Sequence, residues 1–249
     1  MSGSIGLILI GDELLSGKRQ DAHLANAARL FAERGLALDW VHIEHDDLVI
    51  LTRVFRETLR SGDIVFSYGG IGSTPDDVTR PAAAAAADVP LVRHPEIVHL
   101  LEKRFGEVAY PNRIRMAEVP EGASLIPNPP GLIPGFSIAD HHFLPGFPDM
   151  SARMLAWVLD ERYRARHHER AVEQLIEVLD TPESELVPLM ERLLLAHPDV
   201  RLSSLPAGGK PWRVEIGLKG APVAVDSAIA TLTADLDTNA IPWKLGRRL

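Results

Sequence analysis

One stretch of the chain, residues 64–80 (IVFSYGGIGSTPDDVTR), combines residue types that could bind phosphate together with a divalent cation. Glycines lack a Cβ atom, so their backbone N–H groups can approach a ligand closely. Carboxylates are the hard oxygen ligands that magnesium prefers. The candidates are three glycines, two hydroxyl side chains and two acids: Gly69, Gly70, Gly72, Ser73, Thr74, Asp76 and Asp77. This stretch, called the signature loop below, predicts a site for phosphate and Mg²⁺.

The elements around the signature loop are those that such a site needs. Ile64, Val65 and Phe66 form a short apolar run of the kind that fills a buried strand. Thr79 is positioned as the N-cap of a following helix, whose positive N-terminus favours phosphate. The simpler interpretation is a plain turn, since Asp is common in turns and caps and the spacing fits neither the Rossmann fingerprint nor the P-loop.

Two further segments place carboxylates after predicted strands. Residues 5–10 are apolar throughout, as in a parallel strand covered on both faces, and residues 11–13 (GDE) follow at the end where ligands bind in open α/β sheets. Residues 38–43 predict a second strand, after which Asp46 or Asp47 caps a helix. Asp21 is a further predicted helix cap, and Leu24, Ala28 and Phe31 are expected on the buried face of its helix.

Alternation of strands and helices with short links predicts a mostly parallel sheet. Residues 120–135 are rich in Pro and Gly, which excludes regular helix there. Residues 124–126, 136–138 and 142–144 can still be strands, the last two joined by a tight hairpin. A helix through residues 150–163 is expected to complete the first domain.

The charged stretch 164–170 (RARHHER) predicts a boundary, with one domain over residues 1–165 and a small α+β domain over residues 170–249. Residues 171–179 suit either a helix or a strand. If they are a strand, the second domain has the order βαββαβ, a ferredoxin-like fold. Trp212 and Trp243 are expected in its core, and the pairs His141-His142 and His167-His168 on the surface.

Bulk properties limit the function. A chain of 249 residues with a formal charge of −8 is not expected to bind nucleic acid or an anionic membrane. The absence of cysteine excludes disulfides and thiolate chemistry. The opening residues, MSGSIGLILIGDELL, have no basic region before the apolar run and read as a strand rather than a signal peptide. We therefore expect a cytoplasmic protein.

The signature loop resembles the GGxGxTxDDxT motif of the MoaB/MogA/CinA family, the molybdopterin-binding domain superfamily. Four other segments resemble motifs of that family in the same order. They are residues 11–17 (GDELLSG), 46–47 (the acids of VGDD), 128–135 (NPxGxxPG) and 144–148 (LPGxP). The chain is most similar to a short CinA-like protein without the C-terminal deamidase domain.

The resemblance implies a three-layer αβα fold like that of MogA. It also implies that Asp46 and either Asp76 or Asp77 hold a divalent cation and act in catalysis. The residues that it implies for pterin or nucleotide binding come from three segments: Gly11, Asp12, Glu13, Ser16 and Gly17; Gly69, Gly70, Gly72, Ser73 and Thr74; Asn128 and Gly131. His23 stands where the family usually has asparagine, Ser73 where CinA-like members usually have proline, and residues 132–133 where Thr-Ala is usual.

Two chemistries follow from the resemblance, adenylylation of molybdopterin with Mg-ATP and hydrolysis of a pyrophosphate bond as in ADP-ribose. The residues do not decide whether water or a pterin phosphate attacks. A binding or interaction module without catalysis is the third alternative. Arg113 and Arg115 fit phosphate contacts and a solvated helix face equally well. Relatives lead us to expect a dimer or a trimer.

Overall fold

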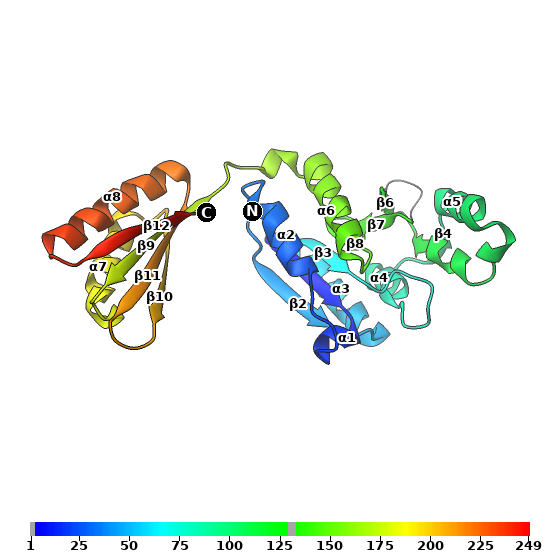
Figure 1. The fold of residues 1–249 in the computed structure, drawn as a ribbon. Helices are drawn as coiled ribbons and strands as arrows, with labels where there is room; N and C mark the ends of the chain where they lie inside the picture. Colours follow the sequence, from blue (N-terminus) through cyan, green and yellow to red (C-terminus); the bar gives the residue numbers. More distant parts are fainter. Residues whose placement is uncertain (1–2, 129–132) are drawn as a thin grey trace. The chain divides into compact units, whose positions relative to one another are not determined.

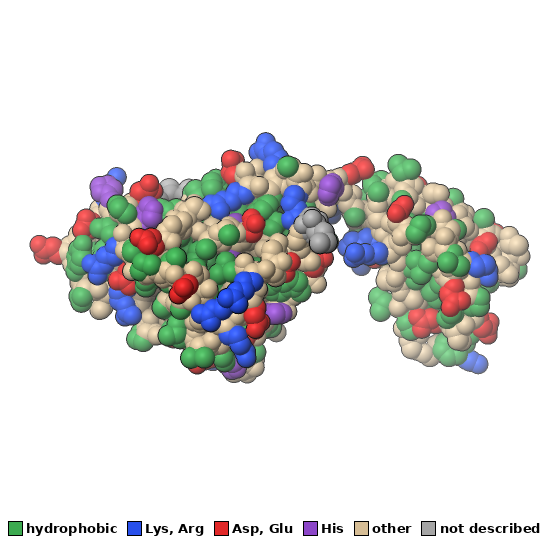
Figure 2. Space-filling model, turned by 180° about the vertical axis from the view of Figure 1, so that it is seen from behind, with side chains coloured by type: hydrophobic (Ala, Val, Ile, Leu, Met, Phe, Trp, Pro, Cys, Tyr) green, Lys and Arg blue, Asp and Glu red, His purple; other side chains and the backbone are tan. Residues whose placement is uncertain are grey.

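A computed structural model describes residues 3–128 and 133–249 of the chain. The chain folds into two compact units, Met1–His167 and His168–Leu249 (Figure 1). Within the described ranges, no helix is long and apolar enough to cross a membrane. Acidic and basic side chains are interspersed over the face that Figure 2 shows.

A six-stranded sheet forms the centre of the first unit, in the order β2-β1-β3-β8-β7-β6. The strands are β1 (Ile5–Ile10), β2 (Trp40–Glu44), β3 (Ile64–Tyr68), β6 (Ser124–Ile126), β7 (Gly135–Ile138) and β8 (His141–Leu144). The pairs β1–β2, β1–β3 and β3–β8 are parallel, while β7 runs antiparallel to both of its neighbours. The expectation of a mostly parallel sheet with one hairpin is confirmed.

Helices cover both faces of this sheet, which makes the first unit a three-layer αβα domain (Figure 1). On one face, α2 (His23–Ala32) and α6 (Pro148–Arg162) pack on Leu7, Leu9 and Phe66. On the other face, α3 (Leu48–Ser61) and α4 (Thr79–Ala87) pack on Ile8, Ile10 and Val65. The alternation along β1 explains both faces, because successive side chains of a strand point in opposite directions.

Smaller elements complete the first unit. They are α1 (Asp12–Leu15), β4 (Leu91–Arg93), α5 (Pro95–Phe105), β5 (Glu118–Pro120) and 3₁₀ turns at Gly106–Ala109, Arg113–Ala117 and Arg164–Arg166. Strands β4 and β5 pair with each other as a separate ribbon.

The second unit has the ferredoxin-like order βαββαβ. Its elements are β9 (Val172–Leu179), α7 (Glu183–Ala196), β10 (Arg201–Ala207), β11 (Arg213–Gly220), α8 (Pro222–Thr238) and β12 (Trp243–Arg248). The antiparallel sheet order is β10-β11-β9-β12. The ambiguous segment is thus a strand, with Ile176 and Val178 of one face buried in the core.

Three sequence-based expectations about burial are wrong. Helix α2 buries Ala27, Leu30 and Phe31, whereas Leu24 is 40% exposed, so its buried face is rotated from the expected one. The side chain of Trp212 is 37% exposed because it precedes β11 rather than lying within it, while Trp243 is partly buried against the core.

The expectation that His141-His142 lies on the surface is also wrong, because both rings are fully buried in β8. The two rings face opposite layers, and each has polar partners. His141 bonds Ser67 Oγ through Nε2 at 2.7 Å, and His142 bonds the Tyr163 hydroxyl through Nε2 at 2.7 Å. Burial lowers the pKa of His141 to about 3 and that of His142 well below its ordinary value. His167 is half-buried and His168 exposed.

Candidate functional site

The loops that follow the parallel strands meet at one edge of the sheet. The amide of Gly11, after β1, donates to the carbonyl of Glu44 at the end of β2 (3.1 Å), and the amide of Gly69, after β3, donates to Leu144 at the end of β8 (3.0 Å). Gly69 has a φ of +106°, and a Cβ atom there would lie 2.6 Å from the carbonyl oxygen of Ile10. Glycine is therefore required for β1 and the signature loop to come this close.

Four carboxylates gather at this edge. The amide of Asp12 donates to Asp46 Oδ2 (3.0 Å), which joins the loops after β1 and β2. Burial is the largest cause that raises the pKa of Asp46; the Asp12 amide lowers it, and the charges of Asp12, Glu13 and Asp76 raise it further. The electrostatic influence of Asp76 on Asp46 shows that the signature loop approaches the other two loops.

His45 is a member of this edge that the sequence did not single out. Its Nδ1 lies 2.8 Å from Asp12 Oδ1, and both side chains are more than half exposed. Its position in the sequence could have identified it, because it directly precedes Asp46, a predicted cation ligand.

Asp47 and Asp21 have capping roles. The Asp47 carboxylate accepts from the amides of Val49 and Ile50, both at 2.9 Å, which confirms that one acid of the pair caps α3 and leaves Asp46 uncommitted. Asp21 accepts from the first two amides of α2, those of His23 and Leu24, at 2.9 and 2.8 Å. Ala22 occupies the cap position of α2, and Asp21, one residue earlier, supplies the side chain that binds these amides.

The two acids of the signature loop are placed differently. Asp77 turns inward, where Oδ1 accepts from the amide of Gly72 (2.7 Å) and Oδ2 accepts from the amide (2.8 Å) and hydroxyl (2.5 Å) of Thr74. Asp76 is exposed, and the side chain of the neighbouring Thr74 is the main cause that lowers its pKa. Both oxygens of Asp77 are thus engaged in holding the loop, whereas Asp76 lies open to solvent.

Thr79 is not the N-cap that the sequence suggested. Val78 occupies the cap position, and the Thr79 hydroxyl donates back to the carbonyl of Gly69 at 2.9 Å. Gly70, with φ +65°, lies directly against this hydroxyl. Thr79 therefore closes the signature loop on itself.

The internal bonds of the loop determine which of its amides are available. Those of Gly72 and Thr74 are taken by Asp77. In the described part of the chain, the amides of Gly70, Ile71 and Ser73 have no acceptor. Free backbone N–H groups in a glycine-rich turn of this kind can bind an anion.

A buried cation lies beneath the signature loop. Arg80 is 3% exposed, and its Nη1 donates to the carbonyls of Ile71 and Gly72, the latter at 3.0 Å. Its Nε and Nη2 have no partner among the described residues. Burial lowers the pKa of Arg80 to about 10, with Asp77 and Glu118 acting in the opposite sense. The guanidinium therefore adds positive charge below the free amides.

Sequence reasoning missed Arg80, although a cation in the first turn of a helix is unfavourable to the helix dipole and could have served as a signal. A small cavity of about 160 Å³ borders Ser73, Arg80, Arg115 and Glu118. Arg115 thus lies beside the signature loop, whereas Arg113 is exposed and donates to the carbonyl of Val108.

The remaining predicted binding residues are less closely joined. Ser16 Oγ donates within its own loop to the carbonyl of Glu13 (3.3 Å), and Gly17 faces open space. Asn128 follows β6, which two strands separate from β3; its Nδ2 donates to the carbonyl of Ile133 (2.9 Å), while its buried Oδ1 has no partner among the described residues. Gly131 lies outside the described residues.

The carboxylates of Asp12, Glu13, Asp46 and Asp76, called the acid cluster below, fit one mode of magnesium binding. Across residues 3–128 and 133–249, no three His, Asp or Glu side chains converge into a ready metal cage. Magnesium is commonly held by one or two carboxylates together with ligand phosphates and waters. Asp46 and Asp76 next to the free amides suit this shared mode, and the charges of Asp12, Glu13 and Asp76 add to the burial that raises the pKa of Asp46.

The fold and the edge described above define a three-layer α/β protein with acidic and glycine-rich loops at the carboxyl ends of parallel strands. Residues 6–165 match the family described as "Probable molybdopterin binding domain". This match covers more than half of the chain, which therefore belongs to that family. The resemblance stated from the motifs is confirmed.

Relatives and solved structures agree with this assignment. A "CinA-like protein" of Desulforapulum autotrophicum is 32% identical over 79% of this chain, which spans 50% of that relative. A Pyrobaculum calidifontis protein is 29% identical, covering 81% of this chain and 80% of its own. The crystal structure of "the protein CinA with unknown function from Thermoplasma acidophilum" superposes with a TM-score of 0.59 at 26% identity, covering 64% of this chain and 98% of its own.

Proposed function

We propose that the first unit binds a phosphate-bearing pterin or nucleotide together with Mg²⁺ at the carboxyl ends of its parallel strands. The observation that carries the proposal is the meeting of Asp46 with Asp12, Glu13 and Asp76, beside a loop with free amides. Such a group of negative charges favours a cation, and the cation in turn favours phosphate.

Each group then has its own role. Asp46 and Asp76 hold the cation with the ligand's phosphate oxygens, and Asp77 keeps the signature loop in shape. The amides of Gly70, Ile71 and Ser73 bind phosphate, and Arg80 adds electrostatic attraction from below. Gly11, Ser16 and Gly17 have small side chains or none, so the ligand can pass close to the loop after β1.

Hydrolysis of a pyrophosphate bond is the second candidate function. It is favoured by the further carboxylates of Asp12 and Glu13 beside Asp46, since one that does not hold the cation can accept a proton from a metal-bound water.

Titration calorimetry and product analysis separate these functions. Purified protein is incubated with ADP-ribose, ATP and other dinucleotides, with Mg²⁺, Co²⁺ or a chelator. Cation-dependent binding without turnover supports the first function, and cation-dependent cleavage supports the second. Asp76→Asn should weaken either one. A protein that binds none of these ligands and ignores Mg²⁺ is instead an interaction module.

The domain limits and the assembly belong to the same proposal. We expect residues 1–165 and 170–249 to fold as separate domains, which limited proteolysis tests by cleavage within 164–170. We expect a dimer or trimer, which sedimentation analysis measures directly.

A further inference from the structure

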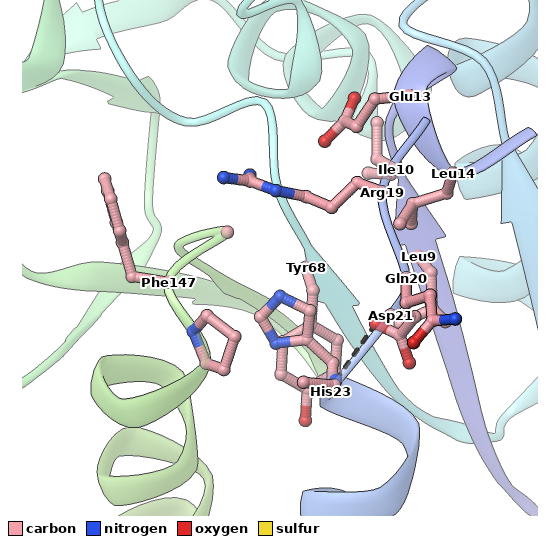
Figure 3. A pocket seen from close by; sticks show the side chains of 13 residues that line it. Leu9, Ile10, Glu13, Leu14, Arg19, Gln20, Asp21, His23, Tyr68 and Phe147 are labelled. Atoms are coloured by element: carbon pink, nitrogen blue, oxygen red, sulfur yellow. Dashed lines mark hydrogen bonds between the residues drawn. The ribbon is translucent and has the colours of Figure 1, made fainter. Parts of the chain in front are cut away.

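A second cavity, of about 210 Å³, opens next to Glu13 (Figure 3). Its walls come from the ends of β1 and β3, the segment before α2 and the loop before α6. We call it the His23 pocket. The lining residues used below are Glu13, Leu14, Arg19, His23, Tyr68 and Phe147.

The floor of the His23 pocket is aromatic and fixed. The imidazole of His23 is 9% exposed and lies over the ring of Tyr68, with centroids 4.7 Å apart and planes tilted by 32°. His23 Nδ1 lies 3.1 Å from Ser151 Oγ, which itself donates to the carbonyl of Phe147 at 3.0 Å. The contact between Nδ1 and this hydroxyl holds the imidazole in one orientation.

Burial favours the neutral form of the His23 ring. Burial lowers its pKa, and the charge of Asp21 and the Gly146 backbone offset this only in part. A neutral imidazole offers a flat, weakly polar surface to a ligand.

The wall of the His23 pocket includes an unusual side chain. Phe147 is 66% exposed, although nothing in the first unit's core requires a large aromatic residue there. Figure 3 shows its ring across the pocket from Ile10 and Leu14, with Arg19 extending between them. An exposed aromatic ring beside a cavity suits stacking against a flat partner.

We propose that the His23 pocket binds the planar heteroaromatic ring of the ligand, the nucleobase or pterin, while its phosphates lie on the acidic and glycine-rich loops. Only the placement of the ligand's phosphates in this inference rests on the proposed function. Phe147 and Leu14 cover the ring, His23 supports it, and Arg19 at the rim attracts the adjoining phosphate. Glu13 borders the His23 pocket and belongs to the acid cluster, so one ligand can span the two.

The test compares probes that contain only one half of such a ligand. Binding of pyrophosphate with Mg²⁺, of adenosine, of a phosphate-free pterin and of ADP-ribose is measured by calorimetry. The variants are Phe147→Ala, Phe147→Trp and His23→Asn. Val49→Ala, which truncates a 76% exposed apolar side chain on α3, is the matched control.

Phe147→Ala should weaken binding of the ring-containing probes about tenfold or more, as expected for a lost stacking partner, and leave pyrophosphate unchanged. Phe147→Trp should keep the affinity, and His23→Asn should weaken the ring probes alone. The melting temperatures of the two Phe147 variants should match that of Val49→Ala, because the exposed Phe147 side chain contributes little to the core.

The outcomes separate this inference from the proposed function. The His23 pocket is not the ring site if the unaltered protein binds neither adenosine nor the phosphate-free pterin and binds ADP-ribose no more tightly than pyrophosphate. It is also not the ring site if Phe147→Ala changes no affinity. If ring probes bind and pyrophosphate with Mg²⁺ does not, the phosphate site is wrong and the ring site stands. Equal losses for every probe in Phe147→Ala also overturn the inference.

Discussion

The backbone amide of Asp12 donates a hydrogen bond to the side chain of Asp46, with 3.0 Å between N and Oδ2. The parallel register of β1 and β2, in which Ile10 lies opposite Glu44, brings these residues together. The bond favours the charged form of Asp46, but burial and three neighbouring carboxylates outweigh it and the pKa of Asp46 rises. The protein thus maintains a charge cluster that a cation would relieve.

Replacing Asp46 should remove the response of the protein to Mg²⁺. The pKa of Asp46 is raised above 3.8 in the folded state, so its ionisation costs stability as the pH rises through that window. At pH 7, Asp46→Asn should be as stable as the original protein, or more so, in a chelator. Thermal melting should show a Mg²⁺-induced stabilisation in the original protein that is smaller at pH 4 and absent in Asp46→Asn. An equal Mg²⁺ shift in both proteins would contradict a cation site at Asp46.

Substitutions of the neighbouring Asp76 and Asp77 should have opposite consequences. Asp77→Asn loses at least one of the bonds to Gly72 and Thr74, because an amide has one oxygen where the carboxylate has two, and stability should fall by about 1–3 kcal/mol. Asp76→Asn changes an exposed side chain and should keep its stability while losing cation-dependent ligand binding. Urea unfolding and calorimetry measure the two effects. Destabilisation by Asp76→Asn alone would reverse the assigned roles.

Arg80→Met should weaken anion binding more than it weakens the fold. The side chain keeps a similar volume, and removing a guanidinium with two unpartnered nitrogens offsets the loss of its bonds to Ile71 and Gly72. Without the charge, the affinity for pyrophosphate should fall on the order of tenfold, about 1.4 kcal/mol. Arg113→Met, which removes an exposed guanidinium, is the control. Comparable losses in the two variants would show that Arg80 acts only through net charge.

Local patterns were sufficient for most of the fold. The apolar runs of β1 and β3 and the alternation of apolar and polar residues along β11 each predicted a strand, and each is a strand in the structure. A helix cap by Asp46 or Asp47 followed from the same logic, and the cap is Asp47. Burial within an element was less predictable, since α2 turned its face by one residue and brought His23 inside.

The features that could not be predicted depend on contacts between distant residues. Asp76 and Asp77 are chemically identical neighbours, and only the path of the loop sends one inward to Gly72. His141 and His142 look like surface residues until Ser67 and Tyr163, from other elements, satisfy their nitrogens. Arg80 is buried because the signature loop folds back over it.

The buried histidines predict loss of stability in acid. His141 has a pKa of about 3 in the folded protein and an ordinary value of 6.5 when unfolded. Between these values the unfolded chain takes up a proton that the folded chain excludes, so stability falls as the pH drops from about 6.5 toward 3. His142 acts in the same direction, and the combined loss should reach a few kcal/mol, on the order of one pKa unit's 1.36 kcal/mol several times over. His141→Gln cannot titrate but can still bond Ser67, so urea unfolding at pH 4 and 7 should show a smaller difference in the variant. Exposed His42→Gln should leave that difference unchanged, and a His141→Gln profile as steep as the original would mean that other groups govern the acid sensitivity.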